Sequence, residues 1–277
     1  MMSLVTSAAT KNMKWNAADY AANSAVQHAW ARELIARLDL RGHEYVLDVG
    51  CGDGKVSAEI AQALPHGSVV GIDASPQMIR FARAAFPPDK VRNLKFQVMD
   101  ARKIRVERPF DLVFSNAALH WVDDHQAFLR RAAAGLRSGG RLVVSCGGKG
   151  NAHDVFVALR PEMRLKRWRE FFRRIPKPYF FYSPADYEKW LPQFGFKTIG
   201  IRLVPKDAVY AGRENFAAWL RTTWLPYVQR VPENAREDFI TAVTDRYLAK
   251  HPPDADGCVH VHMVRLEIEA EKMTSGG

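Results

Sequence analysis

The sequence predicts an α/β protein with a Rossmann-like, seven-stranded and mostly parallel sheet that carries helices on both faces. Nearly continuous apolar runs, which suit strands buried on both faces, alternate with helix-like segments along residues 44–147. A glycine-rich turn, GCGDG at 50–54, follows the first of these runs. Ligands of such sheets bind beyond the carboxyl ends of the strands, where the polar motifs of this chain fall.

The elements can be assigned in chain order. A helix is expected over 17–38, where alanines and leucines form one apolar stripe. The helix at 75–86 has Ser75 as its N-cap and Pro76 in its first turn. The remaining expected elements are helices at 55–64, 125–136 and 183–194, and strands at 44–50, 68–73, 94–100, 110–116, 141–147, 196–204 and 261–271.

Beyond Gly150 the alternation breaks, and helical segments are inserted. A basic helix is expected over 160–174, with its apolar residues at helical spacing, and residues 213–250 also read as helical. We expect a flexible N-terminus at 1–15, one domain at 16–273 and a disordered tail at 274–277. The helical insertions, at about 150–180 and 207–255, would cap the carboxyl ends of the strands.

The composition of the chain narrows the classes of protein to which it can belong. The chain has 277 residues, 47% of them hydrophobic, and a formal net charge of +10. Three cysteines without CxxC spacing favour a reducing compartment over a disulfide framework. No apolar run reaches the roughly 20 residues that span a bilayer, and no signal peptide is evident. These features predict a cytoplasmic protein without integral membrane contact.

Two carboxylates accompany the glycine turn. Asp73 ends the second strand, 25 positions after Asp48, and could accept both ribose hydroxyls of an adenosine. Asp100 ends the third strand and could face an adenine amino group. Each feature alone has a plainer interpretation, namely a tight turn without a ligand, a helix-capping aspartate and an exposed loop aspartate.

The turn itself discriminates between ligands. Lys55 stands where the dinucleotide fingerprint has its third glycine, and no GKS or GKT follows, so neither a dinucleotide nor a phosphate-gripping loop fits. Asp48 and Asp53 would repel a pyrophosphate but suit a ligand with an ammonium and a sulfonium group. S-adenosylmethionine (SAM) carries both.

The motifs VLDVGCGDG, GIDAS, VMDAR and FDLVFSNAALHWVDD resemble, in order and spacing, those of class I SAM-dependent methyltransferases over about residues 16–147. The resemblance implies an enzyme with SAM as its cofactor and a defined set of binding residues. They are Tyr20, Asp48, Gly50 and Gly52 for the methionine part, Asp73 for ribose, Asp100 and Ala101 for adenine, Asn116 and Ala117 for the cofactor floor, together with Ala74 and Met78.

The fourth strand end indicates the acceptor. Nucleobase N-methylases carry an Asn/Asp-Pro-Pro-aromatic motif there, whereas this chain has Asn116-Ala-Ala-Leu, which argues against nucleic acid. SNAALHWVDDH and the C-terminal HVHMVRLEIEAE look similar to the trans-aconitate and juvenile hormone acid methyltransferases, which O-methylate small carboxylic acids. That resemblance implies that Gln27 and Trp121 hold the substrate carboxylate, with His120 near the reacting atoms.

Several residues keep two interpretations. His120 is either a base for a hydroxyl acceptor or a solvent-facing polar residue. Arg265 either pairs with a second carboxylate of a diacid or is a surface strand charge. The segment Asp123–His125 suggests a metal less well than it suggests a helix N-terminus, so no metal is expected. The basic helix is a solvated face, a mouth that steers acidic substrates, or a membrane contact.

The sequence therefore predicts a SAM-dependent O-methyltransferase that acts on the carboxylate of a small, acidic molecule. The alternatives are a hydroxyl or carbon acceptor of a natural product and a carboxylate on an acidic acyl carrier protein. A SAM-binding regulator without catalysis is the alternative from another class. The sequence does not identify the acceptor, the pathway or the oligomeric state.

Overall fold

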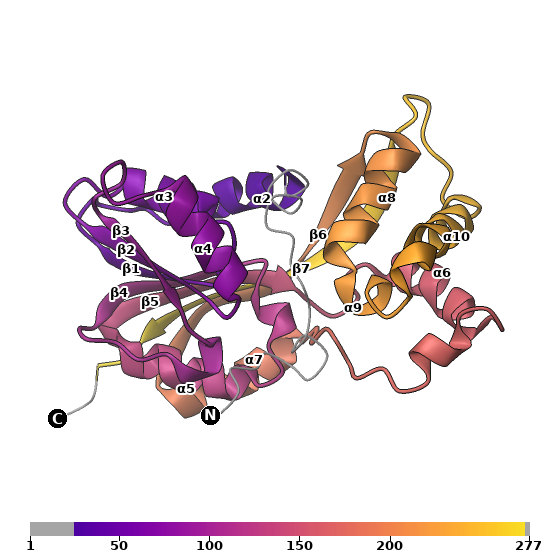
Figure 1. Cartoon of the computed structure of the whole chain (residues 1–277). Coiled ribbons are helices and arrows are strands. Elements are labelled where there is room, and N and C mark those ends of the chain that lie inside the picture. Colours follow the sequence, from indigo (N-terminus) through magenta and orange to yellow (C-terminus); the bar gives the residue numbers. More distant parts are fainter. Residues whose placement is uncertain (1–24, 275–277) are drawn as a thin grey trace.

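The computed structural model describes residues 25–274 and is built on one seven-stranded sheet, in the order β3-β2-β1-β4-β5-β7-β6 (Figure 1). Strands β1 to β5 are parallel, whereas β7 pairs antiparallel with both β5 and β6. The predicted Rossmann-like, mostly parallel fold is confirmed. The strands are β1 Tyr45–Val49, β2 Ser68–Asp73, β3 Leu94–Val98, β4 Phe110–Asn116, β5 Leu136–Gly147, β6 Phe196–Tyr210 and β7 Val259–Lys272.

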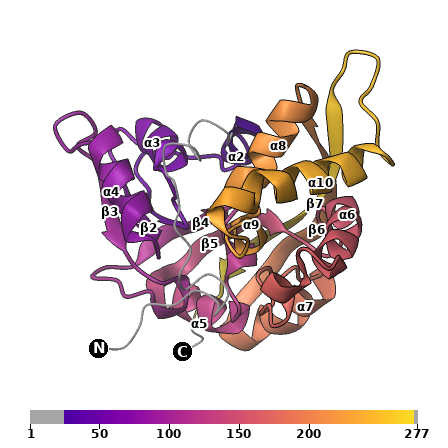
Figure 2. The ribbon, with the colours of Figure 1, turned by 45° about the vertical axis from the view of Figure 1, so that its right-hand side comes forward.

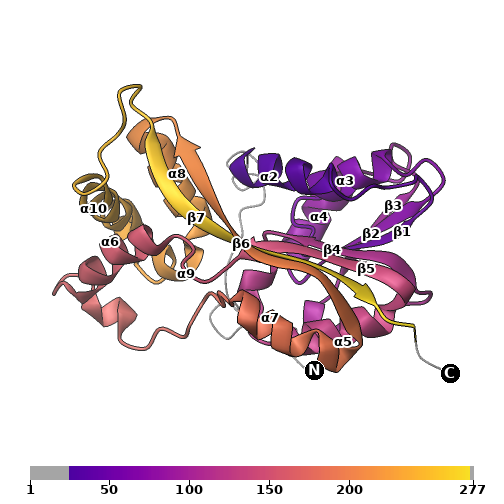
Figure 3. The ribbon, with the colours of Figure 1, turned by 180° about the vertical axis from the view of Figure 1, so that it is seen from behind.

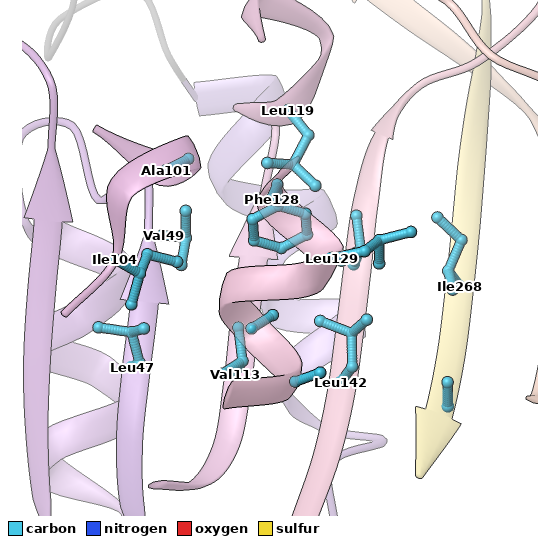
Figure 4. Packing of buried hydrophobic residues seen from close by; sticks show 14 of the residues in the cluster. Leu47, Val49, Ala101, Ile104, Val113, Leu119, Phe128, Leu129, Leu142 and Ile268 are labelled. Atoms are coloured by element: carbon cyan, nitrogen blue, oxygen red, sulfur yellow. The ribbon is translucent and has the colours of Figure 1, made fainter. Parts of the chain in front are cut away.

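Helices cover both faces of this sheet. One face packs against α2 (Ala25–Ile35), α3 (Lys55–Gln62) and α4 (Pro76–Ala85), through side chains such as Leu34 and Ile60. The other face packs against α5 (His125–Gly135) and α7 (Pro184–Trp190). Figure 4 shows Phe128 and Leu129 of α5 among strand residues such as Leu142. The strands β1, β2 and β4 and the second half of β5 are therefore buried on both faces, which accounts for their continuous apolar runs.

Local capping sets where these helices begin. Ser75 accepts a hydrogen bond from the Met78 N–H at 3.3 Å, and Asp124 accepts one from the Ala127 N–H at 2.8 Å. The Ser183 hydroxyl and backbone N–H both donate to the Asp186 carboxylate, at 2.7 and 2.8 Å. These caps satisfy N–H groups that have no partner inside the helix, and they therefore fix where α4, α5 and α7 begin.

A second lobe lies beyond the carboxyl ends of β4 and β5. The strands β6 and β7 run past the rest of the sheet, and helices pack on their outer halves (Figures 1 and 3). Figure 2 shows one helix of this lobe, α9 (Leu225–Val228), on the side of the lobe that is nearer the sheet. The lobe is aromatic-rich, with Phe216, Trp219 and Tyr247 in its core. Its helices are α6 His153–Arg164, α8 Gly212–Thr223, α9 Leu225–Val228 and α10 Arg236–Leu248.

Four expectations about individual segments need correction. The helix expected at 17–38 is α2, within the described residues, and 17–24 lie outside them. The stretch 213–250 is three helices, because Pro226 lies in the first turn of α9 and Pro232 precedes a 3₁₀ turn at Glu233–Ala235. The strand β5 begins at Leu136 rather than 141, with a register shift against β4 where the SGG segment lies.

The expected basic helix at 160–174 is also wrong. Helix α6 ends at Arg164, Leu165 is extended, and a 3₁₀ turn follows at Arg169–Phe172. Trp168 and Phe172 both pack against Phe239 of α10, at ring distances of 5.4 and 5.3 Å. Among residues 25–274, no helix has both the length and the apolar character that crossing a bilayer requires.

Candidate active site

The glycine turn GCGDG joins β1 to α3 and lies beside the end of β2. The N–H groups of Gly50 and Cys51 donate to the Ile72 carbonyl at 2.7 and 3.0 Å. Gly50 has φ +78°, and a Cβ at this position would stand 2.1 Å from the Cβ of Ala118. Only glycine combines this conformation with such a close approach to the loop after β4.

Carboxylates surround this turn. Asp48 is 2% exposed and accepts a hydrogen bond from the Ser57 hydroxyl at 2.6 Å. Burial, opposed by Ser57 and reinforced by Asp73, raises the pKa of Asp48 to about 7. The pKa of Asp73 is also raised by burial, although this carboxylate accepts the N–H groups of Gly52 and Ser75 at 3.1 and 2.8 Å. A cation bound here would favour the ionised form of both groups.

A cavity opens onto this turn. It contains a buried carboxylate from Asp53, which pairs with Lys55 at 3.3 Å, and it reaches the end of β4. Two acidic side chains, those of Asp48 and Asp53, thus line the same small space. The lining residues are His28, Asp48, Gly50, Cys51, Gly52, Asp53, Lys55, Val56, Asn116 and Ala117.

The end of β3 carries an ion pair that the sequence analysis missed. Asp100 is 1% exposed, so the interpretation as an exposed loop residue is wrong. Arg102 binds its carboxylate through Nε and Nη2, the latter at 2.6 Å, and also reaches Asp123 at 2.6 Å. Ala101 is buried at the start of the following 3₁₀ turn. The signal in the sequence that could have revealed this pair is the position of Arg102 two residues after Asp100.

Two further predicted residues lie near the end of β2. Ala74 follows Asp73 directly and is half-buried, whereas Met78 is buried in the first turn of α4. The chain therefore brings the ends of β1, β2 and β3 and the start of α4 to one side of the site. The predicted cofactor residues on these elements line up along adjacent strand ends.

The end of β4 forms the other side. Ala117 has φ +56°, an unusual value for a residue with a side chain, and its N–H donates to the Ser145 carbonyl at 2.8 Å. A 3₁₀ turn, Leu119–Trp121, follows. The Trp121 ring lies 4.8 Å from the Tyr179 ring, centroid to centroid, which connects the end of the sheet to the helical lobe.

His120 is half-buried in this turn rather than facing solvent. Its Nδ1 accepts a hydrogen bond from the Gly147 N–H at 3.3 Å, so the neutral ring carries its proton on Nε2. Burial, the nearby charge of Arg265 and His125 lower the pKa of His120 to about 3. The ring is therefore neutral at physiological pH and is a weak base.

Arg265, on β7, was not among the predicted site residues, and its interpretation as a surface charge is wrong. It is 4% exposed, and β7 pairs it with Gly147 at the carboxyl end of β5. Its Nη2 donates to Asn116 Oδ1 at 3.0 Å and to the Ser145 carbonyl at 2.6 Å. A buried cation in the middle of β7 thus ties this strand to the ends of β4 and β5.

The remaining predicted residues belong to the N-terminal segment. Tyr20 lies outside the described residues. Gln27 lies in α2, but its side chain is outside what the structure describes. Their neighbour Trp30, in the same helix, has its ring centroid 5.6 Å from the Arg265 guanidinium carbon. Helix α2 thus passes beside the middle of β7. Asp124 caps α5, in agreement with the interpretation of Asp123–His125 as a helix start.

Comparison with known sequences gives one consistent result. A family model described as a methyltransferase domain matches residues 46–140. An uncharacterized methyltransferase of Schizosaccharomyces pombe is 34% identical over 269 residues, covering 93% of this chain and 98% of its own length. A trans-aconitate 2-methyltransferase of Deinococcus radiodurans is 30% identical, covering 87% and 92%. One from Escherichia coli O7:K1 is 29% identical, covering 93% and 98%.

Solved structures share the fold at low identity. The YcgJ protein of Bacillus subtilis superposes with a TM-score of 0.61 at 18% identity, covering 90% of this chain and all of that one. A phosphoethanolamine N-methyltransferase of Haemonchus contortus, solved with S-adenosylhomocysteine, gives 0.57 at 18%, covering 89% of this chain and 53% of that one.

Proposed function

This chain belongs to the SAM-dependent methyltransferases, and we propose that it transfers the methyl group to the carboxylate of a small organic acid. Relatives that cover nearly the whole chain are named trans-aconitate 2-methyltransferases. Their sequence identities of 29–30% support a chemical class of acceptor, and they do not specify which molecule is methylated. The proposal therefore depends on the chemistry of the residues near the end of β4.

The state of His120 carries the proposal. A hydroxyl acceptor has to lose a proton as it attacks, and a histidine with a pKa of about 3 is poorly matched to accept one near neutral pH. A carboxylate is already ionised and needs no base. The Nε2 proton of neutral His120 can instead orient a carboxylate without a full opposite charge, as the Trp121 indole N–H can.

The cofactor would occupy the opposite side of the site. The acidic cavity at the glycine turn suits the ammonium and sulfonium groups of SAM, with Asp48, Gly50 and Gly52 at the methionine part. Asp73 would accept the ribose hydroxyls through lone pairs that its two backbone hydrogen bonds leave available. The other proposed contacts are Asp100, Ala101, Ala74 and Met78 around adenine, Asn116 and Ala117 beneath the cofactor, and Tyr20 at the methionine end.

The transfer is a single displacement. A carboxylate oxygen attacks the methyl carbon, the carbon–sulfur bond breaks, and its electron pair stays on sulfur. The products are a methyl ester and S-adenosylhomocysteine, and no proton moves. The rate then depends on holding oxygen, carbon and sulfur in line at near-attack distance. Gln27, Trp121 and His120 are the residues we propose for this positioning, and the aromatic lobe would exclude water.

The test is methyl transfer from radiolabelled SAM to matched acceptors. A panel of short carboxylic acids would be compared with the alcohols and amines of the same carbon skeletons. We expect label in the acids alone, released by mild base because methyl esters hydrolyse. Base-stable label would contradict the proposal and would indicate a hydroxyl, nitrogen or carbon acceptor. SAM binding without transfer to any member of the panel would count against it and favour a regulator.

A further inference from the structure

A buried histidine lies beside the turn that carries His120 and Trp121. His125, the first residue of α5, is 1% exposed, and each of its ring nitrogens has a partner. Its Nε2 lies 2.7 Å from the Leu119 carbonyl oxygen, and its Nδ1 lies 2.6 Å from the Tyr187 hydroxyl of α7. A carbonyl only accepts hydrogen bonds, so Nε2 carries the proton, and Nδ1 of the neutral ring accepts from Tyr187.

The bond to Leu119 fixes the direction of this turn. Leu119 is 0% exposed and begins the 3₁₀ turn Leu119–Trp121. Its carbonyl belongs to the same planar peptide unit as the N–H of His120, so a partner that orients the carbonyl also orients the start of His120. The carbonyl accepts a bond from the Val122 N–H inside the turn, at 2.8 Å, and the bond from His125 of α5. The turn is therefore attached to the first residue of α5.

Tyr187 extends this connection to α7 and to the loop that precedes it. The Tyr187 side chain is 0% exposed and reaches His125 from α7. In the loop before α7, the Phe180 N–H donates to the His120 carbonyl at 2.8 Å. The ring of Tyr182, also in this loop, lies 4.5 Å from the His125 ring, edge to face. His125 thus contacts both the turn at 119–121 and the segments that pack against it.

The chemistry of His125 does not suit proton transfer. Burial lowers the pKa of this imidazole to about 4, and both ring nitrogens are engaged by the protein. Any contribution to the reaction is therefore geometric. Methyl transfer depends on alignment at near-attack distance, and a misplacement of about 1 Å can cost on the order of 100-fold in rate.

We propose that His125 is a positioning residue for the methyl acceptor, and that it acts through the Leu119 carbonyl. By fixing that peptide it holds His120 and Trp121 in the orientation that the acceptor needs. The inference rests on the proposed function, because it takes these two side chains as groups that orient the acceptor carboxylate. Tyr187 supports the role, since its bond to Nδ1 keeps the proton on Nε2, where the Leu119 carbonyl accepts it.

The test compares two amides at this position. His125→Gln places a side-chain N–H where Nε2 stood, so it can still donate to the Leu119 carbonyl, whereas the shorter side chain of His125→Asn cannot. His125→Asn should lower kcat by about 10- to 100-fold, and His125→Gln should recover most of this loss. The loss should fall on kcat more than on KM, because the groups that bind the acceptor remain and only their alignment changes. Each kcat would be divided by the number of sites that bind S-adenosylhomocysteine, so that unfolded protein does not count.

A matched pair of tyrosine variants separates positioning from folding. Tyr187→Phe removes the hydroxyl that donates to Nδ1 of His125, and it should lower kcat per site by less than His125→Asn does, because the bond from Nε2 remains. Tyr247→Phe removes a similarly buried hydroxyl in the helical lobe, which donates to the His260 carbonyl at 2.7 Å. Both substitutions should lower the free energy of unfolding in a urea titration, but only Tyr187→Phe should change kcat per site.

The possible outcomes distinguish this inference from the proposed function. An unchanged kcat per site in His125→Asn would overturn the inference and leave the carboxylate acceptor in place, as would an equal loss in His125→Gln. Base-stable label from the wild-type protein would overturn the proposed function, and kcat per site for that other acceptor would then decide the inference. A wild-type protein that transfers methyl to no acceptor would overturn both.

Discussion

The two sides of the site differ in charge. The ends of β1 and β2 carry Asp48, Asp53 and Asp73 around a glycine turn, and burial raises the pKa of Asp48 to about 7. The ends of β4 and β5 lie beside a buried arginine, Arg265 in the middle of β7, and a neutral histidine, His120. The acidic side suits a cationic cofactor, and the cationic side suits an anionic acceptor. One site can thus attract two oppositely charged reactants, each to its own side.

The two sides also differ in the parts of the chain that form them. The acidic side is made of backbone turns and short side chains on the parallel strands. The cationic side depends on β7, more than a hundred residues later in the chain, and on contacts to the aromatic lobe, such as that between Trp121 and Tyr179. Changes on the acidic side should therefore affect cofactor binding, and changes on the cationic side should affect the acceptor.

The largest expected effect is on the acidic side, for Gly50→Ala. The new Cβ would stand 2.1 Å from that of Ala118 at a φ of +78°. Strain and overpacking together should lower the free energy of unfolding by about 2–5 kcal/mol. Urea titration and calorimetric binding of S-adenosylhomocysteine measure both consequences. Gly200→Ala, where no atom lies within 4 Å of the new methyl group, is the matched control and should change little. Wild-type binding by Gly50→Ala would contradict this.

On the cationic side, Trp121→Ala should reduce kcat/KM by about 100-fold through misplacement of the acceptor. The affinity for SAM should stay near the wild-type value, because the ring contacts His120 and Tyr179 rather than the glycine turn. Trp121→Phe separates the ring from its N–H. A Trp121→Ala protein that keeps both full turnover and SAM affinity would refute the assignment.

The acidic side should make SAM affinity depend on pH. Above pH 7 Asp48 is ionised and ready for the cation, whereas below pH 7 the bound cofactor has to displace a proton from it. Affinity should therefore fall on acidification, by up to tenfold per pH unit below about 7. Calorimetry across pH 5.5–8.5 measures this. Asp48→Asn removes the titrating group, so its affinity should be lower and nearly flat with pH. A flat wild-type profile would exclude this linkage.

The smallest expected effect is for His120→Asn on the cationic side. If His120 only orients a carboxylate, kcat should fall by less than about tenfold and the rate should show no new pH dependence. A general base would instead contribute about 10²–10⁴-fold. A loss in that larger range, with a rate that rises with pH through a basic pKa, would point to an acceptor that has to be deprotonated.

The sequence predicted the acidic side better than the cationic side, and the reason is distance along the chain. Gly50, Asp48 and Asp73 lie at strand ends that local apolar patterns reveal, and parallel strands bring such ends together. Arg265 lies within an alternating strand, and alternation does not say which neighbours a strand has. It is buried because β7 enters between β5 and β6 and crosses the end of β5 at Gly147.

Local sequence patterns also predicted the helical lobe incompletely. Its helical content was predictable, but the basic segment at 160–174 was read as one helix because its apolar residues have helical spacing. Trp168 and Phe172 instead meet Phe239 of α10 through a turn. Similarly, Arg102 forms an ion pair with the Asp100 carboxylate, and the sequence motifs do not predict this pair. Tertiary contacts decide such details, and local periodicity does not encode them.

The division of charge between the two sides is tested most directly by binding acceptors of different charge to the protein loaded with S-adenosylhomocysteine. That product lacks the sulfonium, so any preference comes from the protein. Calorimetry would compare a dicarboxylic acid, its diamide and the diamine of the same length. We predict that the diacid binds measurably and that the diamine does not. A diamide or diamine that binds as tightly as the diacid would contradict a cationic acceptor side and, with it, the proposed carboxylate substrate.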